Sequence, residues 1–308
     1  MCVLKMEENK ELSEEEVLNS LDNESLLNVI NNFLPENQKI SNEKGMILIP
    51  ESKKVIMRLK KLGPIKEDFE LGIDFLKEAE KDLKRSKRSY LEKDFSDAIY
   101  HLQQVTEKIM KSYGLIQGTF TKKDLFDINH QTPKAFIKMV QEQNMELFLT
   151  SIKILYPDLN TNMTNLQETI ESKNKEIALL TAKELNSHLD LAEKLDEALS
   201  KTDLDNILKD TLPKLSKLQG NETPYPTFSI MKFTSIFIKM YLISIMTYPH
   251  EAFTRYPDRD IKPSQYNESL GIVQVAPRIF ILLDETVCIL NEFITWKNEI
   301  AKTSIQTN

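Results

Sequence analysis

Apolar residues recur every three or four positions through much of the chain, a spacing that predicts amphipathic helices. In the helix predicted from Pro64 to about Ser89, one apolar stripe consists of Phe69, Ile73, Leu76, Ala79 and Leu83. A second helix is predicted from Phe95 to Tyr113, after a short polar link in which Asp94 is the expected N-cap. Because the link is short, the two helices are expected to form an antiparallel hairpin.

The rest of the chain continues the helical pattern. Short helices are expected after Ser13 and Ser25, and the only good strand candidate is the segment 45–50, GMILIP, which is too short to stand alone. Loops are expected at 114–129 and 249–263. Further helices are predicted over 134–155, 158–174, 175–200, 203–218, 227–248 and 264–302, and Pro277 should kink or divide the last one.

Composition agrees with an all-α protein. The chain has 308 residues but only 7 glycines, about a third of average usage, and glycine is what tight turns and phosphate-binding loops require. The predicted organisation is a helical region at 1–62 with a disordered start, an up-and-down bundle in two parts at 64–140 and 223–302, and a helical insertion at 141–222 between them.

One apolar segment has the length of a membrane span, residues 228–246. Lys232 and Lys239 lie within it, and each would cost about 2.5–3.5 kcal/mol near the centre of a bilayer. Their spacing of seven places them on one helical face, which favours a core helix with one wet stripe over a membrane helix. With an acidic N-terminal stretch instead of a signal peptide, a cytoplasmic location is expected.

The overall charge limits the kind of nucleic-acid contact that is possible. The formal net charge is −7, so nonspecific coating of phosphates is not expected and any RNA contact should be local. Cys2 and Cys288 are the only cysteines, which excludes a disulfide framework and a CxxC zinc site.

Three features in a fixed order carry a family resemblance. The run from Asp94 to Gly114 contains Gln103, Gln104, Glu107, Lys108 and Lys111; His130 follows it; and the segment 252–258 reads AFTRYPD. In this order the chain resembles the HEPN family, in which a glutamine-rich second helix, a histidine at the third helix and an RYP element before the last helix recur. The resemblance implies a helical bundle that associates with nucleotides or RNA, dimerisation, and a nucleotidyltransferase-type protein partner. About 125 residues separate His130 from Arg255, more than is usual in that family, hence the predicted insertion.

The candidate ligand-binding residues are Gln104, Glu107, Lys108, Lys111, His130, Arg255 and Tyr256. Gln104, Lys108 and Lys111 share a helix face, since residues three and four apart are neighbours, and the lysines could hold phosphate. The simpler alternative is a solvated face on which Glu107 and Lys111 form an ordinary i,i+4 ion pair.

Arg255, Tyr256 and His130 also have two interpretations each. Arg255 and Tyr256 could grip a phosphate and stack on a base, or Arg255 could bond to Glu107 or to helix carbonyls inside the bundle and tie down the last loop. His130 could act as a general base or be a structural residue at the start of a helix.

Several activities are disfavoured. No histidine follows an arginine at the spacing Arg-x4–6-His of the HEPN ribonucleases, so the chain is not expected to be a metal-independent ribonuclease of that type. P-loop, Rossmann and hydrolase-elbow motifs are absent, and no pairing of histidines suggests a metal site. No catalytic residue, metal or cofactor is therefore assigned.

Three functional hypotheses remain. The first is a HEPN protein that binds a nucleotide or structured RNA. The second is an interaction scaffold with a vestigial pocket, which a folded insertion with an apolar groove would favour. The third is a nucleotide-processing enzyme or accessory subunit of a nucleotidyltransferase, which requires Glu107, His130 and Arg255 to converge.

Overall fold

The computed structural model describes residues 68–128, 130, 132–143, 173–200 and 230–306, with a few isolated positions among the first 42. The chain divides into two compact units, residues 1–63 with 206–222 and residues 64–205 with 223–308. All regular elements of the described residues are helices, which confirms the all-α class. The predicted strand at 45–50, the helix predicted at 203–218, most of the one predicted at 158–174, the second half of the one predicted at 134–155 and most of the helical region predicted at 1–62 lie outside the described residues.

Helices α4 (Phe69–Leu91) and α5 (Phe95–Gln117) form the predicted hairpin. The Asp94 side chain caps α5 by accepting a bond from the backbone N–H of Asp97 at 3.2 Å. Most of the predicted stripe on α4 is buried, but Ile73 is only half-buried. The neighbouring Gly72 is buried against α5, at a point where a Cβ would lie 2.9 Å from the Ile116 side chain. The two helices therefore approach closely.

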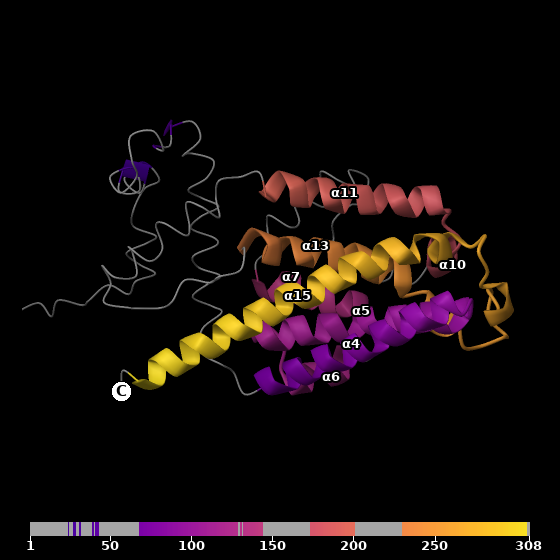
Figure 1. Cartoon of the computed structure of the whole chain (residues 1–308), viewed down its shortest axis with the longest axis horizontal. Helices are drawn as coiled ribbons and strands as arrows, with labels where there is room; N and C mark the ends of the chain where they lie inside the picture. Colours follow the sequence, from indigo (N-terminus) through magenta and orange to yellow (C-terminus); the bar gives the residue numbers. More distant parts are fainter. Residues whose placement is uncertain are drawn as a thin grey trace, which may run out of the picture. The chain divides into compact units, whose positions relative to one another are not determined.

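Helix α5 is the central element of the second unit. It contacts α4, α7 (Thr132–Gln143), α13 (Ile230–Thr247), α14 (His250–Phe253) and α15 (Gly271–Gln306). Figure 1 shows α5 running alongside α4. Of its 23 residues, 18 are buried, so its polar side chains need internal partners. The elements that supply these partners determine where a site can form.

Two predicted loops contain helices. Helix α5 continues four residues beyond Tyr113 and ends at Gly118, whose φ of 71° suits glycine. Helix α6 (Lys122–Ile128) follows, begun by a capping pair in which Asp124 Oδ2 accepts the Thr121 N–H at 2.7 Å. The second loop contains α14 and the 3₁₀ turn η2 (Pro263–Gln265). The loop predicted at 114–129 is therefore wrong over α6, and the Thr-x-x-Asp pattern at 121–124, which is similar to a capping box, is the sequence signal that could have indicated this helix.

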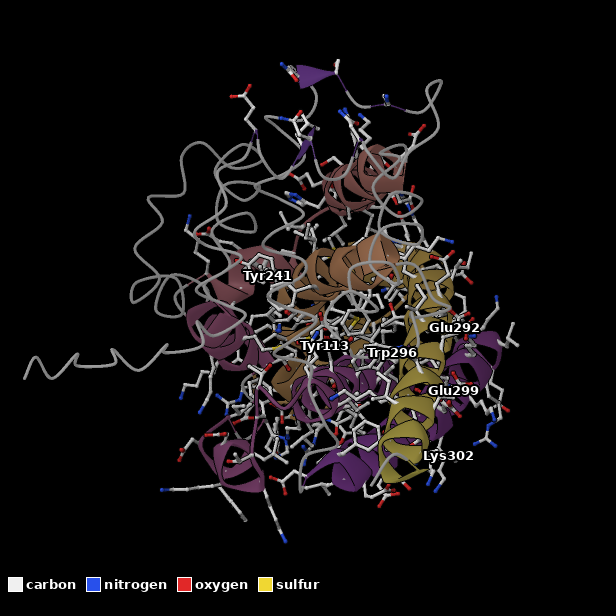
Figure 2. All side chains as sticks on the ribbon, turned by 90° about the vertical axis from the view of Figure 1, so that its left-hand side faces the viewer. Tyr113, Tyr241, Glu292, Trp296, Glu299 and Lys302 are labelled. Carbon is white, nitrogen blue, oxygen red and sulfur yellow. The ribbon has the colours of Figure 1, made fainter. Side chains whose placement is uncertain are left out.

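Aromatic side chains fill the space between α5, α7, α13 and α15. The rings of Tyr113 and Phe233 stack at 5.1 Å, and those of Phe233 and Phe293 at 4.4 Å. In Figure 2, Tyr113, Tyr241 and Trp296 lie among the helices, whereas Glu292, Glu299 and Lys302 point away from α15. Helix α15 begins at Gly271, later than expected, and continues undivided through Pro277.

Helices α10 (Asn174–Ala178) and α11 (Ala182–Ser200) fall in the range predicted as an insertion, yet α10 contacts α13, and α11 packs on both α13 and α15. Figure 1 shows α11 running alongside α13. Arg278 of α15 binds Asp190 and Glu193 of α11, each at 2.8 Å. This part of the range therefore contributes to the same bundle as α13 and α15.

Helix α13 corresponds to the apolar segment. Lys232 is exposed, as a wet stripe requires, but Lys239 is buried, with Nζ 3.7 Å from Glu285 Oε2 on α15. The predicted wet stripe is thus wrong at Lys239, because α15 packs over it and supplies Glu285, a half-exposed acidic partner for its buried charge. Among the described helices, none combines the length and apolar character of a membrane span.

Candidate functional site

The centre of the candidate site is Glu107, a buried carboxylate in the middle of α5. Residues four apart on a helix are neighbours, and Glu107 has one on each side. Lys111 Nζ donates to Glu107 Oε1 at 2.7 Å, and Gln103 Nε2 donates to Oε2 at 3.3 Å. Gln104 Nε2 in turn donates to Gln103 Oε1 at 2.7 Å. The ion pair expected from the simpler reading is present, but it is buried instead of solvated.

His130, between α6 and α7, reaches the same carboxylate. Its Nδ1 lies 3.2 Å from Glu107 Oε1 and 3.3 Å from Oε2. Because an ionised carboxylate only accepts hydrogen bonds, this contact places a proton on Nδ1, and in the neutral ring Nε2 is left as an acceptor. The side chain of His130 is 56% exposed and that of Glu107 is 5% exposed. A buried carboxylate therefore orients an imidazole that solvent and a ligand can reach.

Helix α14 brings a second carboxylate, Glu251, into the same electrostatic neighbourhood. Burial raises the pKa of Glu251 above its ordinary value; the charge of Glu107 adds to the rise, and His130 and Arg255 partly offset it. Arg255 NH1 lies 3.8 Å from Glu251 Oε1. We call the residues of this region the Glu107 cluster: Gln103, Gln104, Glu107, Lys111, His130, Glu251 and Arg255.

Arg255 is not bonded to Glu107, contrary to one of the alternatives considered for it. Its guanidinium carbon lies 5.4 Å from the ring centre of Tyr100 on α5 and 5.3 Å from that of Tyr256. The Arg255 side chain is 45% exposed, and Tyr256 is also exposed. Arg255 and Tyr256 are thus placed at the edge of the cluster, where a ligand could contact both.

Lys108 is placed apart from the other predicted site residues. Its Nζ bonds to Asp82 of α4, which also lies 3.1 Å from His101 Nδ1. His101 Nε2 is 3.5 Å from Asp97 Oδ1. Burial raises the pKa of Asp82, but the bonds from His101 and Lys108 outweigh it and hold that pKa below its ordinary value. We call this second group the Asp82 cluster: Asp82, Asp97, His101 and Lys108.

Three members of the site region were not among the predicted residues: Tyr100, Gln103 and Glu251. Tyr100 and Gln103 precede the predicted Glu107 on α5 at helical spacings of three and four, which places the three on one face. Glu251 precedes Arg255 by four residues, the spacing of a helical ion pair. These spacings were the available sequence signals. The burial of Gln103 and Glu107 depends on packing by α7, α13 and α14 and has no local signal.

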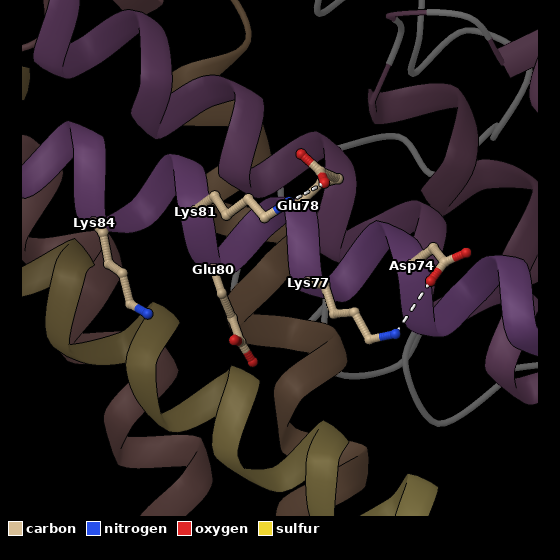
Figure 3. Close-up of a pocket in the computed structure, with 6 residues that line it drawn as sticks. All are labelled: Asp74, Lys77, Glu78, Glu80, Lys81 and Lys84. Atoms are coloured by element: carbon tan, nitrogen blue, oxygen red, sulfur yellow. Dashed lines mark hydrogen bonds and ion pairs between the residues drawn. The ribbon is translucent and has the colours of Figure 1, made fainter.

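An open hollow of about 560 Å³ lies elsewhere, on the outer face of α4, lined by Asp74, Lys77, Glu78, Glu80, Lys81 and Lys84 (Figure 3). Its side chains pair mainly with one another, as in the bonds Lys77–Asp74 at 3.3 Å and Lys81–Glu78 at 2.6 Å. None of them belongs to either cluster. Surface pairs of this kind are typical of a solvated helix face.

Comparison with known families agrees with the first two features of the resemblance, the glutamine-containing helix and His130. Residues 74–195 match the family model of the HEPN domain. The chain carries a HEPN domain. The match to the HEPN domain includes Gln104, Glu107, Lys108, Lys111 and His130, whereas Arg255 and Tyr256 lie beyond its end.

Comparisons with curated proteins and with solved structures give no match. In the ranges that the structure describes, no group of three or more His, Cys, Asp or Glu side chains is arranged to hold a metal ion.

Proposed function

We propose that the HEPN domain binds a nucleotide or RNA at the exposed edge of the Glu107 cluster and does not act as a ribonuclease of the Arg-x4–6-His type. The observation that carries the proposal is a pair of half-exposed groups around two carboxylates: His130 lies 3.2 Å from the buried Glu107, and Arg255 lies 3.8 Å from Glu251, whose pKa responds to the charges of Glu107, His130 and Arg255. Exposed groups on a buried, bonded base are the arrangement expected of a preorganised ligand site.

Each group at this edge has a natural role toward a nucleotide. The planar guanidinium of Arg255 matches a phosphate or stacks on a base, and the ring of Tyr256 offers a second stacking surface. With its proton held on Nδ1 by Glu107, His130 presents Nε2 as an acceptor for a ribose hydroxyl. Gln104, whose partner Gln103 bonds to Glu107, is the remaining polar group available for a base edge.

A nucleotide-processing enzyme is the second candidate, favoured by the convergence of Glu107, His130 and Glu251. A histidine oriented by a carboxylate can transfer a proton, and Glu251, whose pKa is raised, could return one. Incubation with nucleoside triphosphates and short RNAs, followed by chromatography, separates the candidates. Turnover that depends on His130 would favour the enzyme, and binding without turnover favours the binding protein.

The expected partners remain part of the proposal. A homodimer, a nucleotidyltransferase-type protein partner and a cytoplasmic location are supported by the HEPN domain only through what such domains generally do. Sedimentation measurements on the full chain test the homodimer.

Ligand binding is tested by thermal unfolding of the full chain with nucleoside mono-, di- and triphosphates and short RNAs. A ligand present at about 100 times its Kd adds about 2.7 kcal/mol, which raises Tm by several degrees. The proposal predicts a rise that Arg255→Ala abolishes. Arg88→Ala is the matched control, since it also removes one positive charge from an exposed arginine. Arg88 lies on α4, with its Nε 3.9 Å from Glu92 Oε1. An equal loss in both variants would contradict this site.

A further inference from the structure

Four side chains near the Glu107 cluster alternate between aromatic and cationic groups: Tyr100, Arg255, Tyr256 and Arg259. The guanidinium carbon of Arg255 lies 5.4 Å from the Tyr100 ring centre and 5.3 Å from the Tyr256 ring centre. Arg259 continues the series, with its guanidinium carbon 5.9 Å from the Tyr256 ring centre. We call this series the stacking ladder.

The backbone that carries the stacking ladder is anchored to the bundle. Ser96 Oγ on α5 donates to the Thr254 carbonyl at 3.0 Å, and Thr254 Oγ1 donates to the His250 carbonyl at 2.7 Å. His250 itself is buried, with Nδ1 2.6 Å from the Tyr266 hydroxyl. Pro257 further restricts the chain between Tyr256 and Arg259. The ladder is therefore mounted on a constrained segment and is not part of a free loop.

The ladder extends from the cluster toward solvent. Tyr100 is half-buried and precedes Gln103 on the same face of α5, whereas Arg255, Tyr256 and Arg259 are exposed. Exposed arginines that accompany an exposed tyrosine are not needed for the core, because surface ion pairs and cation–π contacts contribute little stability. Arg255 and Arg259 already lie over the Tyr256 ring, so a base that stacks on this ring would take the place of one of these exposed guanidinium groups.

We propose that the stacking ladder binds single-stranded nucleic acid, with successive bases stacked on Tyr256 and the arginine planes and one nucleotide in the Glu107 cluster. This inference rests on the proposed function and narrows its ligand. A single nucleotide would use one plane, whereas the ladder offers several in series. A duplex keeps its bases stacked on each other, so it cannot use these planes.

Charge near the ladder points to stacking as the main attraction. Between residues 251 and 262 there are three acidic residues, Glu251, Asp258 and Asp260, and three basic ones, Arg255, Arg259 and Lys262. Arg255 and Arg259 can neutralise two phosphates at most, so the slope of log affinity against log salt should be no steeper than about −1.4.

Fluorescence anisotropy with a labelled 12-nucleotide RNA and the DNA of the same sequence tests the ladder. Unlabelled duplex RNA and nucleoside monophosphate serve as competitors. Binding of the single strand should be at least about tenfold tighter than binding of either competitor. Tyr256→Leu should weaken it about tenfold or more, since one base–aromatic stack accounts for a factor of this size. Tyr256→Phe, which keeps the ring, should retain binding, and Arg88→Ala should have no effect.

The outcomes separate this inference from the proposed function. If the monophosphate binds as tightly as the strand and Tyr256→Leu changes neither, the ladder is overturned but the nucleotide site stands. Duplex RNA that binds as tightly as the single strand also overturns the ladder. If no ligand binds in any assay, both proposals fail. Tighter binding of RNA than DNA, lost in His130→Ala, would support the ladder and assign recognition of the 2′-hydroxyl to His130.

Discussion

The Asp82 cluster and the Glu107 cluster both include residues of helix α5, and each has a carboxylate bonded to a lysine and a histidine. In the Asp82 cluster the histidine is enclosed, because His101 is only 7% exposed and lies between Asp82 and Asp97. In the Glu107 cluster the histidine is 56% exposed, and Arg255, which pairs with Glu251, is 45% exposed. The same types of group thus form a closed network on one side of the helix and an open one on the other.

The difference shows that the kinds of residue present do not by themselves mark a site. Closure of the Asp82 cluster comes from α4, which packs along the whole of α5 and brings Asp82. At the Glu107 cluster, α14 and the segment between α6 and α7 supply partners but leave an edge exposed. We infer that the closed network contributes stability and that the open one is available to a ligand.

His250 provides the reference for complete enclosure and the largest expected effect. Burial lowers its pKa from 6.5 to about 3, so the folded state holds it neutral where the unfolded state would protonate it. Its contribution to stability is complete above pH 6.5 and is lost as the pH falls toward 3. Each unit in this window costs about 1.4 kcal/mol, or about 3 kcal/mol between pH 6.5 and pH 4.

Urea unfolding at pH 7 and pH 4 measures this loss in the wild type and in His250→Asn. The variant has a lower stability at pH 7 but should lose about 3 kcal/mol less between the two pH values, since it lacks the titrating group. Effects of the other ionisable groups cancel in this comparison. Equal losses in both proteins would contradict the enclosure of His250.

The carboxylates at the base of the two clusters should have similar effects on stability. Asp82→Asn removes the charged partner of Lys108, and Glu107→Gln removes that of Lys111. Each change should lower the free energy of unfolding by about 2–3 kcal/mol. Asp74→Asn, which breaks an exposed pair with Lys77, is the control and should cost less than about 0.5 kcal/mol. Urea unfolding at pH 7 measures all three, and a cost at Asp82 no larger than that at Asp74 would contradict a closed network.

Substitutions in the two clusters should change different properties of the protein, ligand binding in one case and the free energy of unfolding in the other. Arg255→Ala and Tyr256→Leu change exposed side chains and should alter the free energy of unfolding by less than about 0.5 kcal/mol while weakening nucleotide or RNA binding. Lys108→Met should do the reverse, because Lys108 holds Asp82 within the closed network. Unfolding and binding measured on the same preparations test this exchange; a binding loss in Lys108→Met as large as that in Arg255→Ala would remove the distinction between the clusters.

Much of the fold follows from local sequence signals. The stripe of Phe69, Leu76, Ala79 and Leu83 and the cap at Asp94 predict the hairpin of α4 and α5, and the structure has it. Local signals are weaker for short helices, so α6 and α14 were assigned to loops. Lys239 could not be placed, since its burial depends on Glu285, a residue from a different helix.

The candidate site was predicted in its residues more than in its arrangement. Helical spacing placed Gln104, Lys108 and Lys111 on one face, but the structure separates Lys108, which is drawn to Asp82 on α4. Helical spacing relates Tyr100 to Gln103 and Glu251 to Arg255, but only the tertiary fold shows that α14 packs on α5 and brings these residues to one region. The presence of Glu107, His130 and Arg255 in the site region was predicted from their order in the sequence.

Nuclear magnetic resonance of histidine side chains measures the openness of the clusters most directly. The chain has four histidines, so labelling them gives a small set of ring signals, assigned by single substitutions. On addition of a single-stranded RNA, we predict a shift of the His130 signals and no shift for His101 or His250. The His130 shift should be lost in Arg255→Ala. Shifts at His101 with none at His130 would contradict the assignment of the Glu107 cluster as the ligand site.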